Sequence, residues 1–170
     1  MLLTGPLLLA GCSLSSAQVD AGQDVKAERE FVQGTWLNTK RPPTVASFRG
    51  RVLVVHFFTF ACSNCRANVP DYNRWHDQGV NVVGVHTPEL AFERDRANVE
   101  RALKEQGIKH PVLLDPDSKN WKAWGLEYWP TVFVIDKQGR VRKSWVGEFG
   151  YQGQRGFDEL TALIKQLEKE

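Results

Sequence analysis

Residues 51–65 read RVLVVHFFTFACSNC, and this stretch decides the fold. Residues 51–58 are rich in β-branched and aromatic side chains, which is typical of a strand buried on both faces in a parallel sheet. The dipeptide Arg49-Gly50 supplies a turn signal before this run. Directly after the run comes Cys62-Ser63-Asn64-Cys65, followed by a helical segment through Trp75. The stretch therefore predicts a buried strand that delivers two cysteines to the start of a helix.

A C-x-x-C motif at a strand-to-helix turn has a specific chemical use. Cys62 would lie at the helix N-terminus, where free backbone N–H groups and the helix dipole favour a thiolate. Cys65 would follow about one turn later on the same face, within the roughly 5–6 Å between Cα atoms that a disulfide needs. Such a pair can switch between dithiol and disulfide with little movement of the backbone.

Strand and helix patterns alternate beyond this motif. Further strands are expected at residues 80–85, 111–115, 131–136 and 141–146. A helix is expected at residues 90–106, and the turn at residues 137–140 predicts that the last two strands form an antiparallel hairpin. A C-terminal helix carries its apolar side chains at helical spacing, at Leu160, Leu163, Ile164 and Leu167. The sequence therefore predicts an α/β fold with a mixed central sheet flanked by helices on both faces.

The composition is that of an ordinary globular domain. The chain has 170 residues, of which 42% are hydrophobic and 25% are charged. A domain averages about 150 residues, so one domain is expected. The 22 Lys and Arg residues against 20 Asp and Glu residues give a net charge of +2. This balance argues against a nucleic-acid partner bound through bulk electrostatics. No apolar run reaches the roughly 18 residues that a membrane-spanning helix needs.

Three other interpretations of the two cysteines compete with a redox dithiol. A structural disulfide across so short a loop would constrain the unfolded chain little, because the entropic gain grows with loop length. A zinc site would need two further ligands, and the four histidines form no pair with ligand spacing. Thr59-Phe60-Ala61-Cys62 resembles the T-x-x-C motif of peroxiredoxins, although Val55 stands where that family has a proline. A redox dithiol is the favoured interpretation, and no metal is expected.

Further motifs carry a resemblance to a known family. Pro70 lies five residues after Cys65, and Trp129-Pro130-Thr131 precedes a strand that ends in Asp136 and a glycine turn. Shorter motifs lie at residues 84–89, 91–93, 128–130 and 147–148. On these residues the chain resembles the thioredoxin superfamily, and within it the TlpA-like branch. It is most similar there to the thioredoxin-like domain of DipZ-type proteins, from about Trp36 to Leu167. The resemblance implies a thioredoxin fold.

The resemblance also implies roles for individual residues. Cys62 would be the attacking nucleophile and Cys65 the resolving thiol. Pro130 would follow a cis peptide bond and pack against the disulfide, which would leave the backbone of Trp129 free to pair with an extended substrate segment. Trp129 and Phe60 would flank the dithiol as an apolar contact surface. Thiol–disulfide exchange needs no organic cofactor, and none is expected.

One departure from the family pattern concerns proton transfer. Thioredoxins usually carry a buried acid six residues before the first cysteine, where this chain has His56. A histidine exchanges protons near neutral pH but supplies no negative charge, so His56 fits a catalytic role and the role of a hydrogen-bonded core residue equally well. His86, Glu89 and Glu148 are candidates for replacement acid–base groups, because the C-termini of strands converge on the site in open α/β sheets.

The third cysteine, Cys12, ends an apolar N-terminal segment. Leu9-Ala10-Gly11-Cys12 resembles a bacterial lipobox, in which signal peptidase cuts before a cysteine that carries a diacylglyceryl group. Only 11 residues precede Cys12, and none is Lys or Arg. The usual minimum is about 15 residues, so the signal is expected to be truncated. We expect a lipoprotein signal at residues 1–11, a lipidated Cys12 with a flexible tether at residues 12–34, and a thioredoxin-like domain at residues 35–170.

These features predict an extracytoplasmic thiol–disulfide oxidoreductase, tethered by lipid to the periplasmic side of a bacterial cell envelope. Its partners would be client proteins with disulfides or dithiols and a membrane redox partner that recharges the dithiol. Ser13, rather than Asp, follows the lipidated cysteine, which points to the outer membrane in a Gram-negative host. Two alternatives stay open, a thiol peroxidase and a copper-binding thiol chaperone, the latter because thiolates suit Cu(I).

Overall fold

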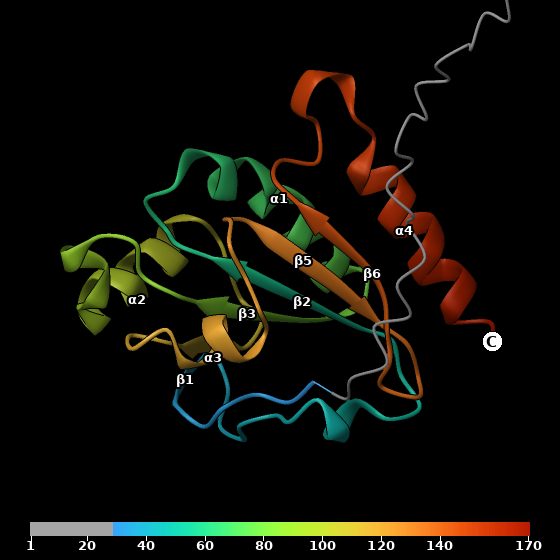
Figure 1. Ribbon diagram of the computed structural model, residues 1–170, viewed down its shortest axis with the longest axis horizontal. Helices are drawn as coiled ribbons and strands as arrows, with labels where there is room; N and C mark the ends of the chain where they lie inside the picture. Colours follow the sequence, from blue (N-terminus) through green and yellow to red (C-terminus); the bar gives the residue numbers. More distant parts are fainter. Residues whose placement is uncertain (1–28) are drawn as a thin grey trace, which may run out of the picture.

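The computed structural model describes residues 29–170, which form a six-stranded sheet with helices on both faces (Figure 1). The strand order is β1-β4-β3-β2-β5-β6. The strands are β1 Thr35–Leu37, β2 Leu53–Phe58, β3 Asn81–His86, β4 Val112–Leu114, β5 Thr131–Ile135 and β6 Val141–Val146. The α-helices are α1 Ser63–Asp77, α2 Arg96–Glu105, α3 Lys119–Ala123 and α4 Gly156–Leu167. Short 3-10 helices are η1 Ala46–Phe48, η2 Ala91–Arg94 and η3 Tyr151–Gly153.

Strand β2 lies at the centre of the sheet, and all of its residues are buried. It pairs in parallel with β3 and antiparallel with β5. Strand β3 pairs in parallel with β4, and β5 forms the expected antiparallel hairpin with β6. The mixed α/β sheet predicted from the sequence is therefore confirmed. The carboxyl ends of β2, β3 and β4 lie at one edge of the sheet, where the chain leaves β2 and enters α1.

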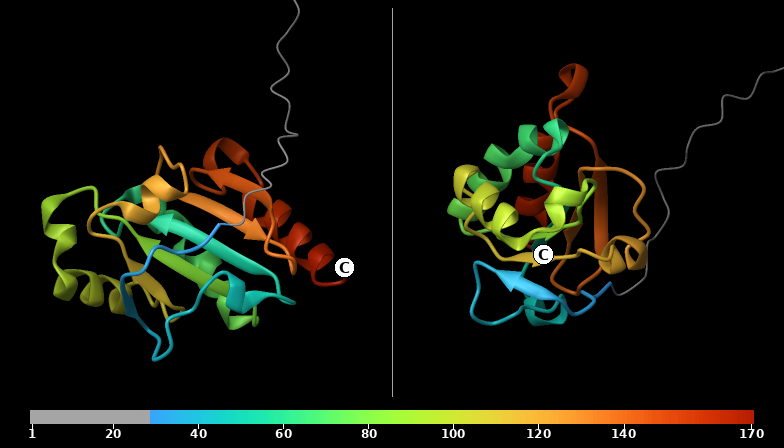
Figure 2. Two further views of the ribbon diagram at one scale, coloured as in Figure 1. Left: turned by 60° about the horizontal axis from the view of Figure 1, so that its bottom comes forward. Right: turned by 90° about the vertical axis from the view of Figure 1, so that its left-hand side faces the viewer.

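One face of the sheet is covered by α1, α2 and α4 (Figure 2). Tyr72 of α1 and Leu160 of α4 share a hydrophobic cluster with Val54 of β2. Leu103 of α2 shares a second cluster with Phe58, at the end of the same strand. The placement of α1 and α2 follows from right-handed crossovers, because β2, β3 and β4 are added in one direction and the helices that connect them fall on one side.

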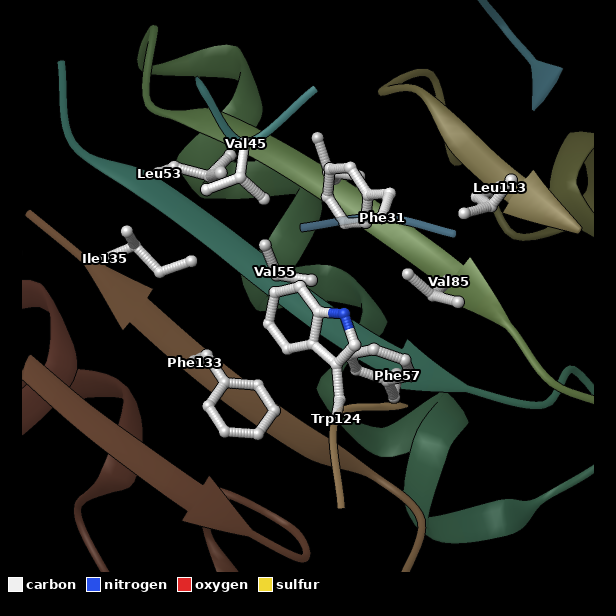
Figure 3. Close-up of a cluster of buried hydrophobic side chains, with 11 residues drawn as sticks. Phe31, Val45, Leu53, Val55, Phe57, Val85, Leu113, Trp124, Phe133 and Ile135 are labelled. Carbon is white, nitrogen blue, oxygen red and sulfur yellow. The ribbon is translucent and has the colours of Figure 1, made fainter. Parts of the chain in front are cut away.

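The opposite face carries α3 and the N-terminal segment of the described chain. Figure 3 shows Trp124, which directly follows α3, over Val55 and Phe57 of β2. The rings of Phe57 and Trp124 lie with their centroids 5.2 Å apart. Phe31 stacks on Trp124 at a centroid distance of 5.7 Å. The N-terminal segment therefore completes the hydrophobic core on this face.

The packed part of the chain begins earlier than the expected boundary at residue 35. Phe31 is only 9% exposed, and the backbone N–H of Val32 donates to the side chain of Asn120 at 2.8 Å. The Glu30 carboxylate accepts from the backbone N–H of Val45 at 2.6 Å. A single packed aromatic residue in a polar stretch leaves no periodic signal, which explains the difference. The expected signal, Cys12 and most of the tether fall on residues 1–28, outside the described residues.

Two further differences concern short elements. The helix expected at residues 90–106 is divided into η2 and α2 at Asp95, whose carboxylate caps α2 by accepting the N–H of Ala97 at 2.7 Å. Strand β1 and helix α3 were not expected, and they have three and five residues, too few for a periodic pattern. Within residues 29–170, no helix has the length and the apolar character that crossing a membrane requires.

Candidate active site

The two cysteines of the C-x-x-C motif lie at the start of α1, directly after the short connection from β2. Cys62 is the N-cap residue of α1, with φ of −68° and ψ of 125°, and its carbonyl accepts the N–H of Arg66 at 3.1 Å. Both thiols are free. Cys62 is partly exposed, whereas Cys65, one turn into the helix, is 1% exposed. A partner sulfur from solvent can therefore reach Cys62 but not Cys65.

Burial also separates the two thiols chemically. Burial raises the pKa of the Cys65 thiol well above its usual value. The neighbouring Cys62 thiol and the Glu93 carboxylate raise the pKa of Cys65 further, and a hydrogen bond from the backbone of Thr59 acts in the opposite direction. Cys65 therefore remains a protonated thiol at neutral pH. Because only a thiolate attacks a disulfide, Cys62 is the group placed to attack first.

The Trp129–Pro130 peptide bond, which was expected to be cis, is cis in the structure. Pro130 is buried, and its carbonyl accepts the N–H of Gly147 at 2.8 Å. Asn68, in the middle of α1, donates to the carbonyl of Gly147 at 3.0 Å and accepts the N–H of Phe149 at 2.9 Å. Asn68 was not expected from the sequence. It links the helix that bears the cysteines to the loop that pairs with Pro130.

The aromatic residues expected to flank the dithiol belong to the same hydrophobic cluster as Cys65. Phe60, Trp129 and Cys62 are all partly buried and pack against the cluster that contains Cys65. Trp129 stacks on Trp121 with ring centroids 4.0 Å apart. The surroundings of the thiols are therefore largely apolar and aromatic, and these side chains shield Cys65 from water.

His56 lies in the core beneath α1 rather than at the exposed end of the site. It is fully buried, and its Nε2 lies 2.8 Å from Nε2 of His110. Its ring stacks on that of Tyr72, with centroids 4.0 Å apart. A Cβ on Gly84 in β3 would lie 3.0 Å from the same Nε2, so glycine makes room for the imidazole. Burial lowers the pKa of His56 well below its usual value, so the ring is neutral.

The three candidates for a replacement acid–base group lie in different environments. His86 is 1% exposed and stacks on Phe60 at a centroid distance of 5.5 Å. Burial lowers the pKa of His86 to about 4, so its ring is neutral at pH 7. Glu89 is exposed, and Glu148 is half-buried with its carbonyl accepting from Trp145 Nε1 at 3.4 Å. His86 thus stacks on an aromatic residue that packs against the cluster of Cys65.

A buried carboxylate does lie beside the motif, and it belongs to Glu93. One of its oxygens accepts the Thr59 hydroxyl and the N–H of Ala61, the latter at 3.0 Å. The other oxygen accepts the N–H groups of Glu89 and Leu90 at 3.0 Å and 2.7 Å. Burial acts to raise the pKa of this carboxyl, but these hydrogen bonds outweigh burial and hold the pKa below its usual value. Glu93 is therefore a carboxylate at neutral pH.

The sequence did not identify Glu93 as an acid–base candidate, although residues 91–93 carried part of the family resemblance. The Thr59 hydroxyl, which the T-x-x-C motif would assign to peroxide chemistry, instead donates to this carboxylate. Among residues 29–170, no group of three or more His, Cys, Asp or Glu side chains is arranged to hold a metal ion.

Comparisons with known proteins agree with this geometry. A family model described as Redoxin matches residues 26–158. The chain is 36% identical over 168 residues to Protein DipZ of Mycobacterium tuberculosis (strain CDC 1551 / Oshkosh). That match covers 94% of this chain but only 23% of the DipZ protein, so the chain spans about a quarter of the relative's length.

Shorter proteins match as well. The chain is 30% identical over 100 residues to the thiol-disulfide oxidoreductase YkuV of Bacillus subtilis (strain 168), covering 57% of this chain and 68% of YkuV. Among solved structures, the thioredoxin-like superfamily protein SPOA0173 superposes with a TM-score of 0.73 and 26% identity. That superposition covers 84% of this chain and 96% of SPOA0173, so nearly the whole of the related fold is present here.

Proposed function

The chain belongs to the Redoxin family and is related to thiol–disulfide oxidoreductases, and we propose that it exchanges protein disulfides through Cys62 and Cys65. The observation that carries this proposal is the inequality of the two thiols at the start of α1. Cys62 is partly exposed at the helix N-terminus, and Cys65 is buried with a raised pKa. Cys62 is thus suited to attack a client disulfide, and Cys65 is suited to attack the resulting mixed disulfide in the second step.

The exchange proceeds in two balanced steps. The Cys62 thiolate attacks one sulfur of a client disulfide, so a Cys62–client disulfide forms and the other client sulfur leaves as a thiolate. The Cys65 sulfur then attacks Cys62, which breaks the mixed disulfide, and its proton goes to the departing client sulfur. The client gains two electrons and one proton from the protein, its first-released thiolate takes a second proton from water, and the Cys62–Cys65 disulfide forms. The same steps run backwards when the client is a dithiol.

Pro130 and Trp129 support client alignment in this proposal. Pro130 is buried, and the aromatic ring of Trp129 packs on the cluster that contains Cys65. A client segment that lies along the backbone of Trp129 would be brought beside Cys62. Asn68 of α1 forms hydrogen bonds with Gly147 and Phe149, and the N–H of Gly147 in turn donates to the carbonyl of Pro130, so these bonds connect α1 to the segment of Trp129 and Pro130.

Single cysteine variants test the assignment of roles. We expect Cys62→Ser to lower the reduction of insulin disulfides by at least about 100-fold, because no thiolate remains at the helix N-terminus. Cys65→Ser should instead accumulate mixed disulfides with clients, visible on non-reducing gels. Ser63→Ala, which changes an exposed residue of the same motif, is the matched control. Multi-turnover insulin reduction by Cys62→Ser would contradict the proposal, and hydrogen peroxide turnover by the same variants tests the peroxidase alternative.

We further propose that the protein acts in the bacterial cell envelope, on the periplasmic side, tethered by a lipid on Cys12. The motif Leu9-Ala10-Gly11-Cys12 supports this placement, and Ser13 points to the outer membrane. In that compartment a membrane redox partner would recharge the dithiol after each cycle.

Fractionation of cells tests the tether. Cys12→Ser should move the protein from the membrane fraction to the soluble periplasmic fraction, because the thioether to the lipid can no longer form. Mass spectrometry of the wild-type protein should show the diacylglyceryl group on Cys12. Wild-type protein found soluble and unmodified would contradict the tether while leaving the redox proposal intact.

A further inference from the structure

An exposed apolar surface lies next to the candidate active site. Leu90 and Phe92 are 48% and 50% exposed, although both are large apolar side chains. Phe92 meets Phe60 edge to face, with ring centroids 5.6 Å apart. We call Phe60, Leu90 and Phe92 the η2 patch, because two of its members lie on or beside η2. Exposed apolar clusters of this kind commonly mark interaction sites.

The η2 patch is continuous with the reactive thiol. Phe60 precedes Cys62 by two residues, and both pack against the cluster that contains Cys65. An extended chain advances about 3.3–3.6 Å per residue, so residues two or three positions from a client cysteine bonded to Cys62 reach the patch. A client segment bonded to Cys62 can therefore place the side chains that flank its cysteine against this surface.

A single buried carboxylate fixes the patch relative to the thiol. The oxygens of Glu93 hold Ala61, directly before Cys62, and Leu90 of the patch by hydrogen bonds of 3.0 Å and 2.7 Å. Phe92 and Glu93 are neighbours, so the inward turn of Glu93 leaves Phe92 at the surface. The patch is thus preorganised beside the motif, which lowers the cost of ordering it when a client binds.

We propose that the η2 patch is a client-docking surface that selects protein disulfides with a large apolar or aromatic side chain two or three residues from the reacting cysteine. The inference rests on the proposed thiol–disulfide exchange and names its substrate class. Packing of such a side chain against the exposed surfaces of Leu90 and Phe92 supplies the selectivity, since aromatic anchors dominate binding at small interfaces. Glu93 is a positioning residue in this scheme, because it acts through Ala61 and Leu90 and contacts no client atom.

Two peptides that differ at one position test the selectivity. Each is a disulfide-linked peptide pair, with either Phe or Gly two residues from the cysteine, offered to the full-length reduced protein. We expect wild type to react about tenfold faster with the Phe peptide at subsaturating concentration, as partial burial of one aromatic side chain implies. In Leu90→Ser/Phe92→Ser the ratio of the two rates should fall to about one. Tyr151→Ser, which changes an aromatic residue 56% exposed on η3, should keep the wild-type ratio.

A misfolded variant would lose its reaction with both peptides together, so the ratio of the two rates separates a loss of selectivity from a loss of folding. Circular dichroism checks the fold of each variant directly. A wild-type ratio near one, or an unchanged ratio in the double variant, would overturn the docking proposal. A concentration-dependent dimer that Phe92→Ser dissolves would also overturn it, because the patch would then belong to a second copy of the chain. Wild-type protein that reacts with neither peptide nor glutathione disulfide would instead refute the proposed function itself.

Glu93→Gln tests the positioning role separately. Glutamine keeps the side-chain shape but replaces one acceptor oxygen with an amide that donates, so it cannot accept from all of the present donors. We expect the preference for the Phe peptide to shrink through a raised KM for that peptide. A purely structural role would lower both rates together and leave their ratio unchanged, and that result would overturn the assignment of Glu93.

Discussion

At the scale of single residues, burial lowers the pKa values of His56, His86 and His110. Nε2 of His56 and Nε2 of His110 lie 2.8 Å apart, so one ring donates and the other accepts, which two imidazolium rings cannot do. Burial lowers the pKa of His110 to about 3, and the nearby His76 lowers it further. His56 therefore takes the position of the buried acid of thioredoxins without its negative charge, and its surroundings favour the role of a core residue.

His86 offers a direct test of this effect, because its folded-state pKa of about 4 lies below the unfolded value near 6.5. As the pH falls below about 6.5 the unfolded chain binds the proton first, so stability is lost down to about pH 4 and is constant below that. We expect His86→Phe to reduce the dependence of the free energy of unfolding on pH by about 1.4 kcal/mol per pH unit near pH 5.

Phenylalanine suits this test because Nε2 of His86 has no hydrogen-bond partner among residues 29–170, and the ring's other hydrogen bond is to the backbone of His86 itself. Phenylalanine can also keep the stacking on Phe60. Urea unfolding at a series of pH values between 4.5 and 7 measures the slope. A variant with the wild-type slope would show that His86 is protonated equally in both states.

The residues whose chemistry depends on identity and spacing were predictable from the sequence. Cys62 and Cys65 were named by a short local pattern and lie at the start of α1, and the bond before Pro130, which the family resemblance implied to be cis, is cis. Glu93 was not predictable, because Glu89 and Glu93 stand in one connection and no spacing tells which carboxylate turns inward. The choice is made by the path of the chain after β3, which brings the N–H groups of Ala61 and Leu90 to the carboxylate of Glu93.

At the scale of elements, α1 both presents the cysteines and anchors the loop that pairs with Pro130. Asn68 satisfies the buried N–H of Phe149 and the carbonyl of Gly147 from within the helix. A buried backbone group without a partner is costly, so this side chain ties the two parts together more firmly than apolar packing alone would.

We expect Asn68→Ala to lower the free energy of unfolding by about 1–3 kcal/mol, because Phe149 N–H and Gly147 C=O lose their partner. Asn64→Ala, at an exposed position of the same helix, is the matched control and should change stability by less than about 0.5 kcal/mol. Urea unfolding at pH 7 measures both. Equal effects of the two substitutions would show that the link between α1 and the loop contributes no stability.

Long elements with a strong pattern were predicted with small errors at their ends, and short elements were not. Strand β2 has the continuous apolar pattern of a strand covered on both faces, and helix α4 has the apolar face that packs against the sheet. Strand β1 exists because Trp36 pairs with Leu113 of β4, a contact far apart in the sequence that no local pattern announces. The same reason hides α3, whose Asn120 side chain accepts the backbone N–H of the distant Val32 at 2.8 Å.

At the scale of the whole molecule, the sheet needs cover on both faces, and the helices that the structure describes on its second face, α3 and η1, are short. The N-terminal segment supplies the missing cover, with Phe31 between Trp36 and Trp124. The Redoxin match begins at residue 26, which agrees with a domain that includes this segment. The domain is therefore longer at its N-terminus than the sequence pattern alone indicated.

This cover should contribute measurably to stability. Phe31 is 9% exposed and packs edge to face on Trp36 at a centroid distance of 5.5 Å. We expect Phe31→Ala to lower the free energy of unfolding by about 3 kcal/mol, at the lower end of the range for a buried aromatic, because the site lies at the edge of the core. Val32→Ala, at a neighbouring side chain 36% exposed, should cost less than about 1 kcal/mol.

Urea unfolding of the full chain, followed by tryptophan fluorescence, measures both substitutions, since Trp36 and Trp124 both touch Phe31. If the segment were only a spacer between the domain and the proposed lipid anchor, both substitutions would leave the unfolding midpoint unchanged. A large effect of Phe31→Ala with a small effect of Val32→Ala would instead place the start of the folded domain before residue 31. Any tether to Cys12 would then have to end upstream of that residue.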